Sequence, residues 1–345
     1  MNEKRQRKTG RSSRAKRVAP DRSPPASAER PLVTIARRLL PAGRDLLIER
    51  FDVREGGLNS TREEVLELAP GAAALVADPT VPVDAELLDA CGKGLEIVAN
   101  FAVGYDNIDL AACRERGVVA TNTPDVLTEA TAELALALAL AAARRMSDAE
   151  RDLRAGRWTG WDPGAYRGIE IAGSTVGVIG MGRIGARFAA LAHGLGAKIV
   201  YSGPSRKPEA ESELGARHLL VEELLERADI VSLHAPASDD TRGMIRRHQL
   251  DLIGPEGVLV NTSRGPLVDP DALADALEAG TLGAAGLDVY PNEPEVPQRL
   301  LDAPRCVLLP HIGSATIPSR DGMARAVAEN VIAVLEGRDP PSRVA

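Results

Sequence analysis

The sequence has few cysteines and no long apolar run, and these absences exclude several classes of protein. Its three cysteines, Cys91, Cys113 and Cys306, are odd in number and widely spaced, which argues against a disulfide framework and a CxxC zinc site. The longest apolar stretch, Leu134 to Ala143, has ten residues, whereas a membrane span needs about 20. We therefore expect no membrane span, no bound metal and a reducing, cytoplasmic environment.

The composition indicates a folded protein of about two domains. At 345 residues, with 44% hydrophobic and 26% charged residues, the chain is neither wholly disordered nor of low complexity. The net charge of −7 is unevenly spread, because residues 1–30 hold ten Lys/Arg and three Asp/Glu against 32 and 46 in the rest. An acidic body makes nucleic acid an unlikely partner.

Residues 1–30 lack apolar periodicity and are expected to be a disordered basic tail outside the fold. An Arg-rich segment with few acidic residues is compatible with an organelle transit peptide or an arm that binds nucleic acid. An extension without a function is the favoured interpretation.

From Pro31 onward, short β-type runs alternate with stretches of helical period, which predicts parallel α/β sheets. The runs of the first set are 32–35, 74–77, 95–99 and 118–121. After Asn122-Thr123-Pro124, a helix of about twenty residues is expected to mark a crossover between domains, buried because it is apolar on most faces. Six further runs predict a doubly wound sheet, and they are 175–179, 198–202, 229–233, 257–261, 283–289 and 306–309. One connecting helix has clear start and stop signals, with Asp269 as its N-cap, Pro270 in its first turn and Gly280 at its end.

A glycine fingerprint follows the first strand of the second set. The run 175–179 leads directly into Gly180-Met181-Gly182-Arg183-Ile184-Gly185, and an amphipathic helix follows. In this context Gly180 permits a tight turn, Gly182 lets a pyrophosphate approach the backbone, and Gly185 allows close packing of helix and strand. We expect a dinucleotide here, and a tight turn without a ligand is the alternative.

The next strand ends at Ser202 and Gly203, where an NAD-selective enzyme places an acidic residue. No carboxylate occurs before Glu209, and Ser205-Arg206-Lys207 offers hydrogen-bond donors and positive charge to a 2′-phosphate. NADP(H) is therefore the expected cofactor, with NAD(H) possible. A solvated basic loop is the alternative interpretation.

Three polar residues lie at or just after the ends of later strands, where ligands of open α/β sheets bind. They are Arg264, Glu293 and His311. Reduction of a 2-oxo acid needs a cation for the carboxylate and carbonyl, a proton donor for the developing alkoxide, and a group that keeps the donor protonated and oriented. Arg264, His311 and Glu293 match these needs in turn. Taken singly, each residue has an ordinary alternative role. Arg264 could be a surface charge, His311 a structural histidine and Glu293 a turn residue.

Ordered motifs carry a resemblance to a known family. They are the glycine fingerprint, Asn100-Phe101-Ala102-Val103-Gly104-Tyr105-Asp106-Asn107-Ile108-Asp109, Thr121-Asn122-Thr123-Pro124-Asp125-Val126-Leu127-Thr128, Gly286-Leu287-Asp288-Val289 and Pro310-His311-Ile312-Gly313-Ser314-Ala315-Thr316. With these motifs, residues 31–342 resemble the D-isomer-specific 2-hydroxyacid dehydrogenases, and within them the glyoxylate/hydroxypyruvate reductase branch.

The resemblance implies a catalytic set of Arg264, Glu293 and His311, with His311 as the acid/base. It implies that backbone amides of Ala102, Val103 and Gly104, together with Arg264, bind the substrate. Further cofactor contacts are expected from Thr128, Thr262, Ser263, Asp288 and Gly313, of which Asp288 lies beside the nicotinamide carboxamide.

The resemblance also implies a domain organisation. A Rossmann-type NAD(P)-binding domain of residues 125–311 is inserted in a discontinuous, flavodoxin-like substrate domain of residues 31–124 and 312–345, with the active site in the cleft between them. A homodimer joined through the nucleotide-binding domains is expected. The segment from Trp158 to Asp162 matches an aromatic segment of the branch, with a packing role and a substrate contact both open. No C-terminal regulatory domain is expected.

The resulting hypothesis is an NADP(H)-preferring reductase of glyoxylate and hydroxypyruvate, in which closure of the two domains excludes water before hydride transfer. One departure bears on the cofactor, because NADP-preferring relatives commonly have an arginine where Pro204 stands. A reductase of a larger sugar acid such as 2-ketogluconate is the enzymatic alternative. A non-catalytic dinucleotide sensor acting as a corepressor is the alternative from another class, since the fold serves both purposes.

Overall fold

Two parallel β-sheets organise residues 30–345, the part of the chain that this computed structural model describes. Residues 31–345 form one compact unit. Residues 1–29 of the predicted basic tail lie outside the described residues, of which Arg30 is the first. Among the residues described, no helix combines the length and the apolar character that a membrane crossing requires.

The first sheet has five parallel strands in the order β2-β1-β3-β4-β5, which is the flavodoxin-like order. Its strands are β1 (Leu32–Ile35), β2 (Asp52–Glu55), β3 (Ala74–Ala77), β4 (Ile97–Asn100) and β5 (Val119–Thr121). The parallel α/β sheet expected from the sequence is confirmed. Sequence analysis missed β2, an edge strand with the polar sequence Asp-Val-Arg-Glu, because a strand with one neighbour and little burial carries no apolar run.

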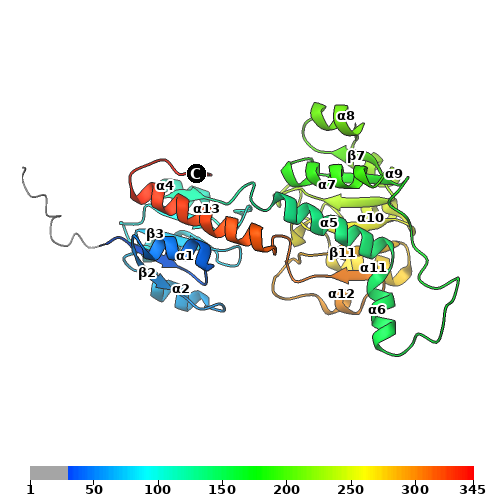
Figure 1. Ribbon diagram of the computed structural model, residues 1–345, viewed down its shortest axis with the longest axis horizontal. Coiled ribbons are helices and arrows are strands. Elements are labelled where there is room, and N and C mark those ends of the chain that lie inside the picture. Colours follow the sequence, from blue (N-terminus) through cyan, green and yellow to red (C-terminus); the bar gives the residue numbers. More distant parts are fainter. Residues whose placement is uncertain (1–29) are drawn as a thin grey trace, which may run out of the picture. The chain divides into compact units, whose positions relative to one another are not determined.

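Side chains alternate along the strands between the two faces of this sheet, and each face has its own hydrophobic core. Ala74 and Val76 of β3 pack with helices α1 (Pro41–Ile48) and α13 (Ile317–Leu335), whereas Leu75 faces the opposite core. That core is covered by α2 (Arg62–Leu68), α3 (Ala85–Cys91) and α4 (Leu110–Glu115). Helices α1 and α13 lie against each other (Figure 1). Gly43 permits this approach, since a Cβ there would overlap the backbone of Ala324.

The second sheet has seven parallel strands in the order β12-β11-β10-β9-β6-β7-β8, which contains the Rossmann order around β6. Its strands are β6 (Thr175–Ile179), β7 (Lys198–Ser202), β8 (Arg217–His218), β9 (Ile230–Leu233), β10 (Val258–Asn261), β11 (Ala284–Leu287) and β12 (Cys306–Leu308). All six predicted strands are present. The additional strand β8 pairs at only two positions on the edge, too few residues for a sequence pattern.

Helices cover both faces of the second sheet, as its two hydrophobic cores show. They are α5 (Thr128–Ala143), α6 (Met146–Arg154), α7 (Arg183–Gly194), α8 (Pro208–Leu214), α9 (Val221–Arg227), α10 (Arg247–Ile253), α11 (Pro270–Ala279) and α12 (Gln298–Asp302), with a 3-10 turn at Gly265–Leu267. Helix α11 begins and ends where predicted, because the Asp269 side chain accepts two backbone N–H groups at its start and Gly280 has a φ of 72° at its end. The crossing helix α5 is shorter than expected, with 16 residues, because the chain turns left-handed at Arg145 before α6. It is also less buried than expected, since half of its residues are buried and Leu140 is exposed.

A histidine at the end of β9 makes the stability of this sheet depend on pH. The ring of His234 lies 5.1 Å from that of Phe188, and its Nε2 is 2.9 Å from Ser232 Oγ. Burial lowers the pKa of His234 from 6.5 to about 3. Between these values the unfolded chain binds a proton that the folded chain does not, so the free energy of unfolding falls as the pH falls below 6.5.

We therefore expect a His234→Phe variant to lose less stability in acid than the unmodified protein. The difference should approach about 1.4 kcal/mol for each pH unit below the unfolded pKa. Urea unfolding between neutral and mildly acidic pH measures it. His193→Phe, at an exposed position of α7, is the matched control and should keep the original slope. Parallel slopes for His234→Phe and the unmodified protein would contradict the assignment.

Candidate active site

The glycine loop after β6 has the geometry of a dinucleotide-binding turn. Gly180 has a φ of 97°, and a Cβ there would come within 2.6 Å of the backbone of His234. A Cβ on Gly185 would overlap the carbonyl oxygen of Gly180, so these two positions require glycine. At Gly182, by contrast, a Cβ would meet nothing within 4 Å. The backbone at Gly182 is therefore open on the side from which a pyrophosphate approaches.

Helix α7 begins directly after this loop. Its N-cap is Gly182, which offers no side chain to the first N–H groups of the helix. Those groups and the helix dipole favour an anion at this end, so the loop fits a dinucleotide pyrophosphate. Among the other predicted residues, Met181 is buried in the core and Ile184 packs against it, so both offer only their backbone to a ligand. Arg183 Nε lies 2.7 Å from Asp125 Oδ1, three residues before Thr128 at the start of α5.

The predicted 2′-phosphate segment lies at the end of β7. Ser202 is buried, and Ser205, Arg206 and Lys207 are exposed. Arg206 Nε lies 3.0 Å from Glu211 Oε1, an acidic partner that the sequence analysis did not assign. Glu211 also accepts the Tyr201 hydroxyl at 2.7 Å, so its carboxylate is fixed close to the strand end.

Arg264 belongs to a tightly held loop after β10. Asn261 donates its side-chain amide to the Arg264 carbonyl at 2.9 Å and accepts the Ser263 N–H at 3.0 Å. The Ser263 hydroxyl donates to the Ala235 carbonyl, and the neighbouring Thr262 is buried. A Cβ on Gly265 would overlap the backbone of Tyr290, so this loop packs directly against the segment that carries Glu293.

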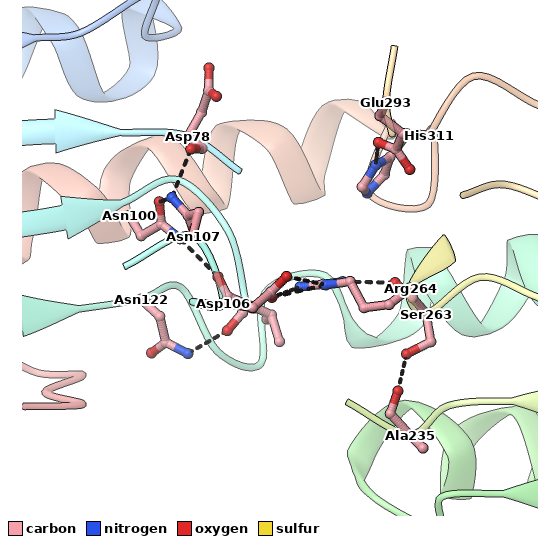
Figure 2. Close-up of polar contacts among 12 residues, drawn as sticks. Asp78, Asn100, Asp106, Asn107, Asn122, Ala235, Ser263, Arg264, Glu293 and His311 are labelled. Carbon is pink, nitrogen blue, oxygen red and sulfur yellow. Dashed lines mark hydrogen bonds and ion pairs between the residues drawn. The ribbon is translucent and has the colours of Figure 1, made fainter. Parts of the chain in front are cut away.

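The Arg264 side chain reaches the loop after β4 (Figure 2). A Cβ on Gly104 would overlap Arg264 Nη2 and come within 2.7 Å of Cζ, so the guanidinium lies directly against the Gly104 backbone. Its Nε is 2.9 Å from Asp106 Oδ1. The structure thus brings together Arg264 and the predicted substrate loop, which are 160 positions apart in the sequence.

Three side-chain and backbone donors hold the carbonyl groups of that loop. The Ala102 carbonyl accepts the Thr123 N–H, the Val103 carbonyl accepts the Asn122 side chain, and the Gly104 carbonyl accepts the Asn100 side chain, each at 2.8 Å. With the carbonyls turned toward these partners, the N–H groups of Ala102 to Gly104 have no hydrogen-bond partner within the described part of the chain. Consecutive free N–H groups form a concavity that binds anions, which suits a carboxylate.

The sequence analysis did not assign the two asparagines that hold this loop, nor Asn107. Asn107 exchanges side-chain hydrogen bonds with Asn100 and donates to the carbonyls of Asp78 and Val81 (Figure 2). Asn100 and Asn107 are both within the quoted 100–109 motif, and Asn122 is within the next one. The available signal was therefore the presence of asparagines at and after the ends of two neighbouring predicted strands.

His311 and Glu293 form a close pair (Figure 2). His311 Nδ1 lies 2.6 Å from Glu293 Oε2, while Oε1 of the same carboxylate accepts the Tyr290 N–H at 2.9 Å. Burial raises the pKa of Glu293, but the hydrogen bond and charge of His311 outweigh this effect and hold that pKa below its ordinary value. The Glu293 carboxylate is therefore ionised at neutral pH and accepts a hydrogen bond from His311 Nδ1. The other ring nitrogen, Nε2, is left for a ligand.

The backbone at His311 is unusual, with a φ of 53°. Such a left-handed conformation is uncommon outside glycine and persists only where surrounding contacts enforce it. Those contacts come from Asp288, whose two carboxylate oxygens accept the N–H groups of Ile312 and Gly313, each at 2.8 Å. Asp288 is fully buried, and burial raises its pKa although both hydrogen bonds oppose the shift. Thr131 of α5 also donates to the Gly313 carbonyl at 3.2 Å.

The aromatic segment is largely exposed. Trp158 is 61% exposed and Trp161 is 85% exposed, so neither contributes to a core among the described residues. Of the two roles considered for this segment, packing into a core is not seen within residues 30–345.

Comparisons with known proteins find similar sequences and structures along most of the chain. Residues 136–313 match the family model described as "D-isomer specific 2-hydroxyacid dehydrogenase, NAD binding domain". The chain is 44% identical over 321 residues to a glyoxylate reductase of Thermococcus onnurineus, an alignment that covers 91% of this chain and 96% of that one.

Two solved structures are similar over nearly the whole fold. A Thermus thermophilus protein aligns with a TM-score of 0.85 at 42% identity, covering 91% of this chain and 100% of that one. An NADPH-dependent glyoxylate/hydroxypyruvate reductase of Sinorhizobium meliloti, in complex with NADP and malonate, aligns with a TM-score of 0.80 at 33% identity, covering 92% and 97%.

Proposed function

The chain belongs to the D-isomer specific 2-hydroxyacid dehydrogenase family, and on that basis we propose that it reduces glyoxylate to glycolate and hydroxypyruvate to D-glycerate. The observation that carries the proposal is the pair of His311 and Glu293, 2.6 Å apart, on a chain that also places Arg264 against the free amides of the 102–104 loop. This combination supplies a proton donor, its partner and an anion site.

The residues of the 102–104 loop, Arg264, His311 and Glu293 have distinct roles in the proposed reaction. The 102–104 amides and the Arg264 guanidinium bind the carboxylate and polarise the 2-oxo group. The reduced nicotinamide, when bound, supplies a hydride to the 2-oxo carbon. His311 Nε2 gives its proton to the oxygen as the negative charge develops, which completes the hydroxyl group. Glu293 fixes the ring through Nδ1 and stabilises its protonated form.

The same proposal assigns the domains. Residues 125–311 are the dinucleotide-binding domain, because they contain all seven strands of the second sheet. Residues 31–124 and 312–345 form the substrate domain, since α13 packs on the first sheet and Arg343 forms an antiparallel bridge with Thr121, the last residue of β5. We also propose a cytoplasmic location, in keeping with three free, buried cysteines.

A homodimer completes this proposal. The segment that spans α6 and the following loop exposes several large apolar side chains, namely Met146, Leu153, Trp158 and Trp161. Exposed apolar clusters of this kind mark interaction surfaces. Sedimentation equilibrium of the purified protein should give about twice the chain mass of 36.5 kDa, and a monomer at all concentrations would reject the dimer.

We propose a preference for NADPH over NADH. A hollow of about 350 Å³ at the end of β7 is lined by Arg206, Glu211, Ala216, Arg217 and His218. Two arginines and a histidine suit a 2′-phosphate, whereas Glu211 already pairs with Arg206 and opposes the phosphate. The preference therefore depends on whether the phosphate displaces Glu211 from Arg206.

An Arg206→Ala variant should raise the KM for NADPH about tenfold and leave the KM for NADH nearly unchanged, because a charge-assisted bond contributes about 1.5–3 kcal/mol. Initial rates with both cofactors at saturating glyoxylate measure this ratio. Arg247→Ala, which removes an exposed arginine of α10, serves as the control. Equal changes for NADPH and NADH would show that Arg206 is only a surface charge.

One set of assays tests the proposed reaction. NADPH and NADH oxidation should be followed with glyoxylate, hydroxypyruvate, 2-ketogluconate, pyruvate and phosphohydroxypyruvate. We expect the highest kcat/KM with glyoxylate or hydroxypyruvate. Preference for 2-ketogluconate would support a sugar-acid reductase instead. Cofactor binding without turnover of any of these acids would reject the proposal and favour a dinucleotide sensor.

A further inference from the structure

The Arg264 guanidinium has a fixed carboxylate partner, Asp106, that no step of the proposed reaction uses. Arg264 Nε lies 2.9 Å from Asp106 Oδ1 and 3.2 Å from Oδ2, and Nη2 is also 2.9 Å from Oδ1. Asp106 comes from the loop after β4 and Arg264 from the loop after β10, so the pair joins the two parts of the site (Figure 2).

The contacts occupy one edge of the guanidinium and leave another open. An arginine has five N–H donors in a planar fork. Asp106 takes the edge formed by Nε and Nη2, and the Ser263 carbonyl accepts Nη1 at 2.7 Å. Because each of these contacts takes one N–H, one N–H on each terminal nitrogen remains for a ligand. This end-on pair matches a carboxylate or an oxo acid in a bidentate contact.

We propose that Asp106 is a positioning residue, which turns the guanidinium of Arg264 so that its end-on pair faces the substrate anion beside Gly104. The inference rests on the proposed reduction of 2-oxo acids. The Arg264 side chain is 25% exposed and has several rotatable bonds, so without a partner it populates other rotamers. Asp106 removes that freedom before the substrate binds, which lowers the entropic cost of binding.

A competing role for Asp106 predicts the opposite change in the KM for the oxo acid. If its carboxylate only occupied Arg264 in place of the substrate, removing its charge would free the arginine and lower the KM for the oxo acid. If it positions Arg264, removing the charge raises the KM. The 51% exposure of Asp106 limits the size of the effect, since half-exposed ion pairs contribute modestly.

The test is a double-mutant cycle with Asp106→Asn and Arg264→Lys. Asp106→Asn should raise the KM for glyoxylate about two- to fivefold with a much smaller change in kcat and in the KM for NADPH. Asp106→Glu, which keeps the charge, should recover part of the loss. In the Arg264→Lys background the Asp106→Asn change should have little further effect, because the fork it orients is gone. Asp52→Asn, on the exposed edge strand β2, is the matched control and should change nothing.

A second measurement separates this inference from the proposed reaction. In ¹⁵N spectra of the arginine Nε–H groups, the Arg264 signal, assigned by its loss in Arg264→Lys, should be protected from exchange with water and lose that protection in Asp106→Asn. Inactivity of the unmodified enzyme toward all 2-oxo acids would reject the proposed reaction, and this spectrum would still decide the role of Asp106. An unchanged or lowered KM in Asp106→Asn, or an Arg264 signal indifferent to the change, would overturn the inference.

Discussion

A His311→Asn variant should bind its cofactor normally and lose a factor of about 10² to 10⁴ in kcat, the range that general acid–base catalysis contributes. Asparagine is neutral and cannot give a proton to the developing alkoxide. It is preferable to glutamine because residue 311 has a φ of 53°, a conformation that asparagine adopts more readily than most residues. The loss of turnover will then report on chemistry rather than on backbone strain.

Two measurements make the His311 prediction specific. The Kd for NADPH, from quenching of intrinsic fluorescence, should be unchanged. His248→Gln, which removes an exposed histidine paired with Glu222 on the surface, is the matched control and should keep full turnover. If His311→Asn retained normal kcat, the proton would have to come from another group and the role of the Glu293 pair would be lost.

The sequence predicted the parallel sheets well because buried strands are marked by local patterns. Strands buried on both faces, such as β9 and β10, appear as short continuous apolar runs. The glycine fingerprint is equally local, since its three glycines fall within six consecutive residues directly after β6. The edge strands β2 and β8 were missed because they are polar or very short.

Long-range pairings were beyond the sequence. Asp106 and Arg264 are 158 positions apart, and nothing in their own neighbourhoods indicates that they meet. Contacts of this kind depend on how strand ends are brought together by the sheet, so only the folded chain reveals them.

An Arg264→Gln variant should lower kcat/KM for glyoxylate by about 10²- to 10³-fold, because loss of one partner of a hydrogen-bonded charge pair costs about 2–5 kcal/mol. The glutamine amide offers one donor group and no charge, so neither the substrate carboxylate nor the developing oxygen charge is balanced. Both KM and kcat should worsen. Arg247→Gln, an exposed position of α10, is the control and should remain fully active.

An Arg264→Lys variant separates charge from geometry at the same position. Lysine keeps the positive charge but lacks the planar fork, so it should recover only part of the activity lost in glutamine. Because Gly104 leaves room for a flat guanidinium directly against the 102–104 loop, a single ammonium will contact the carboxylate without the parallel second bond. Full recovery by lysine would show that the substrate needs only a positive charge there, and that the close approach at Gly104 serves packing alone.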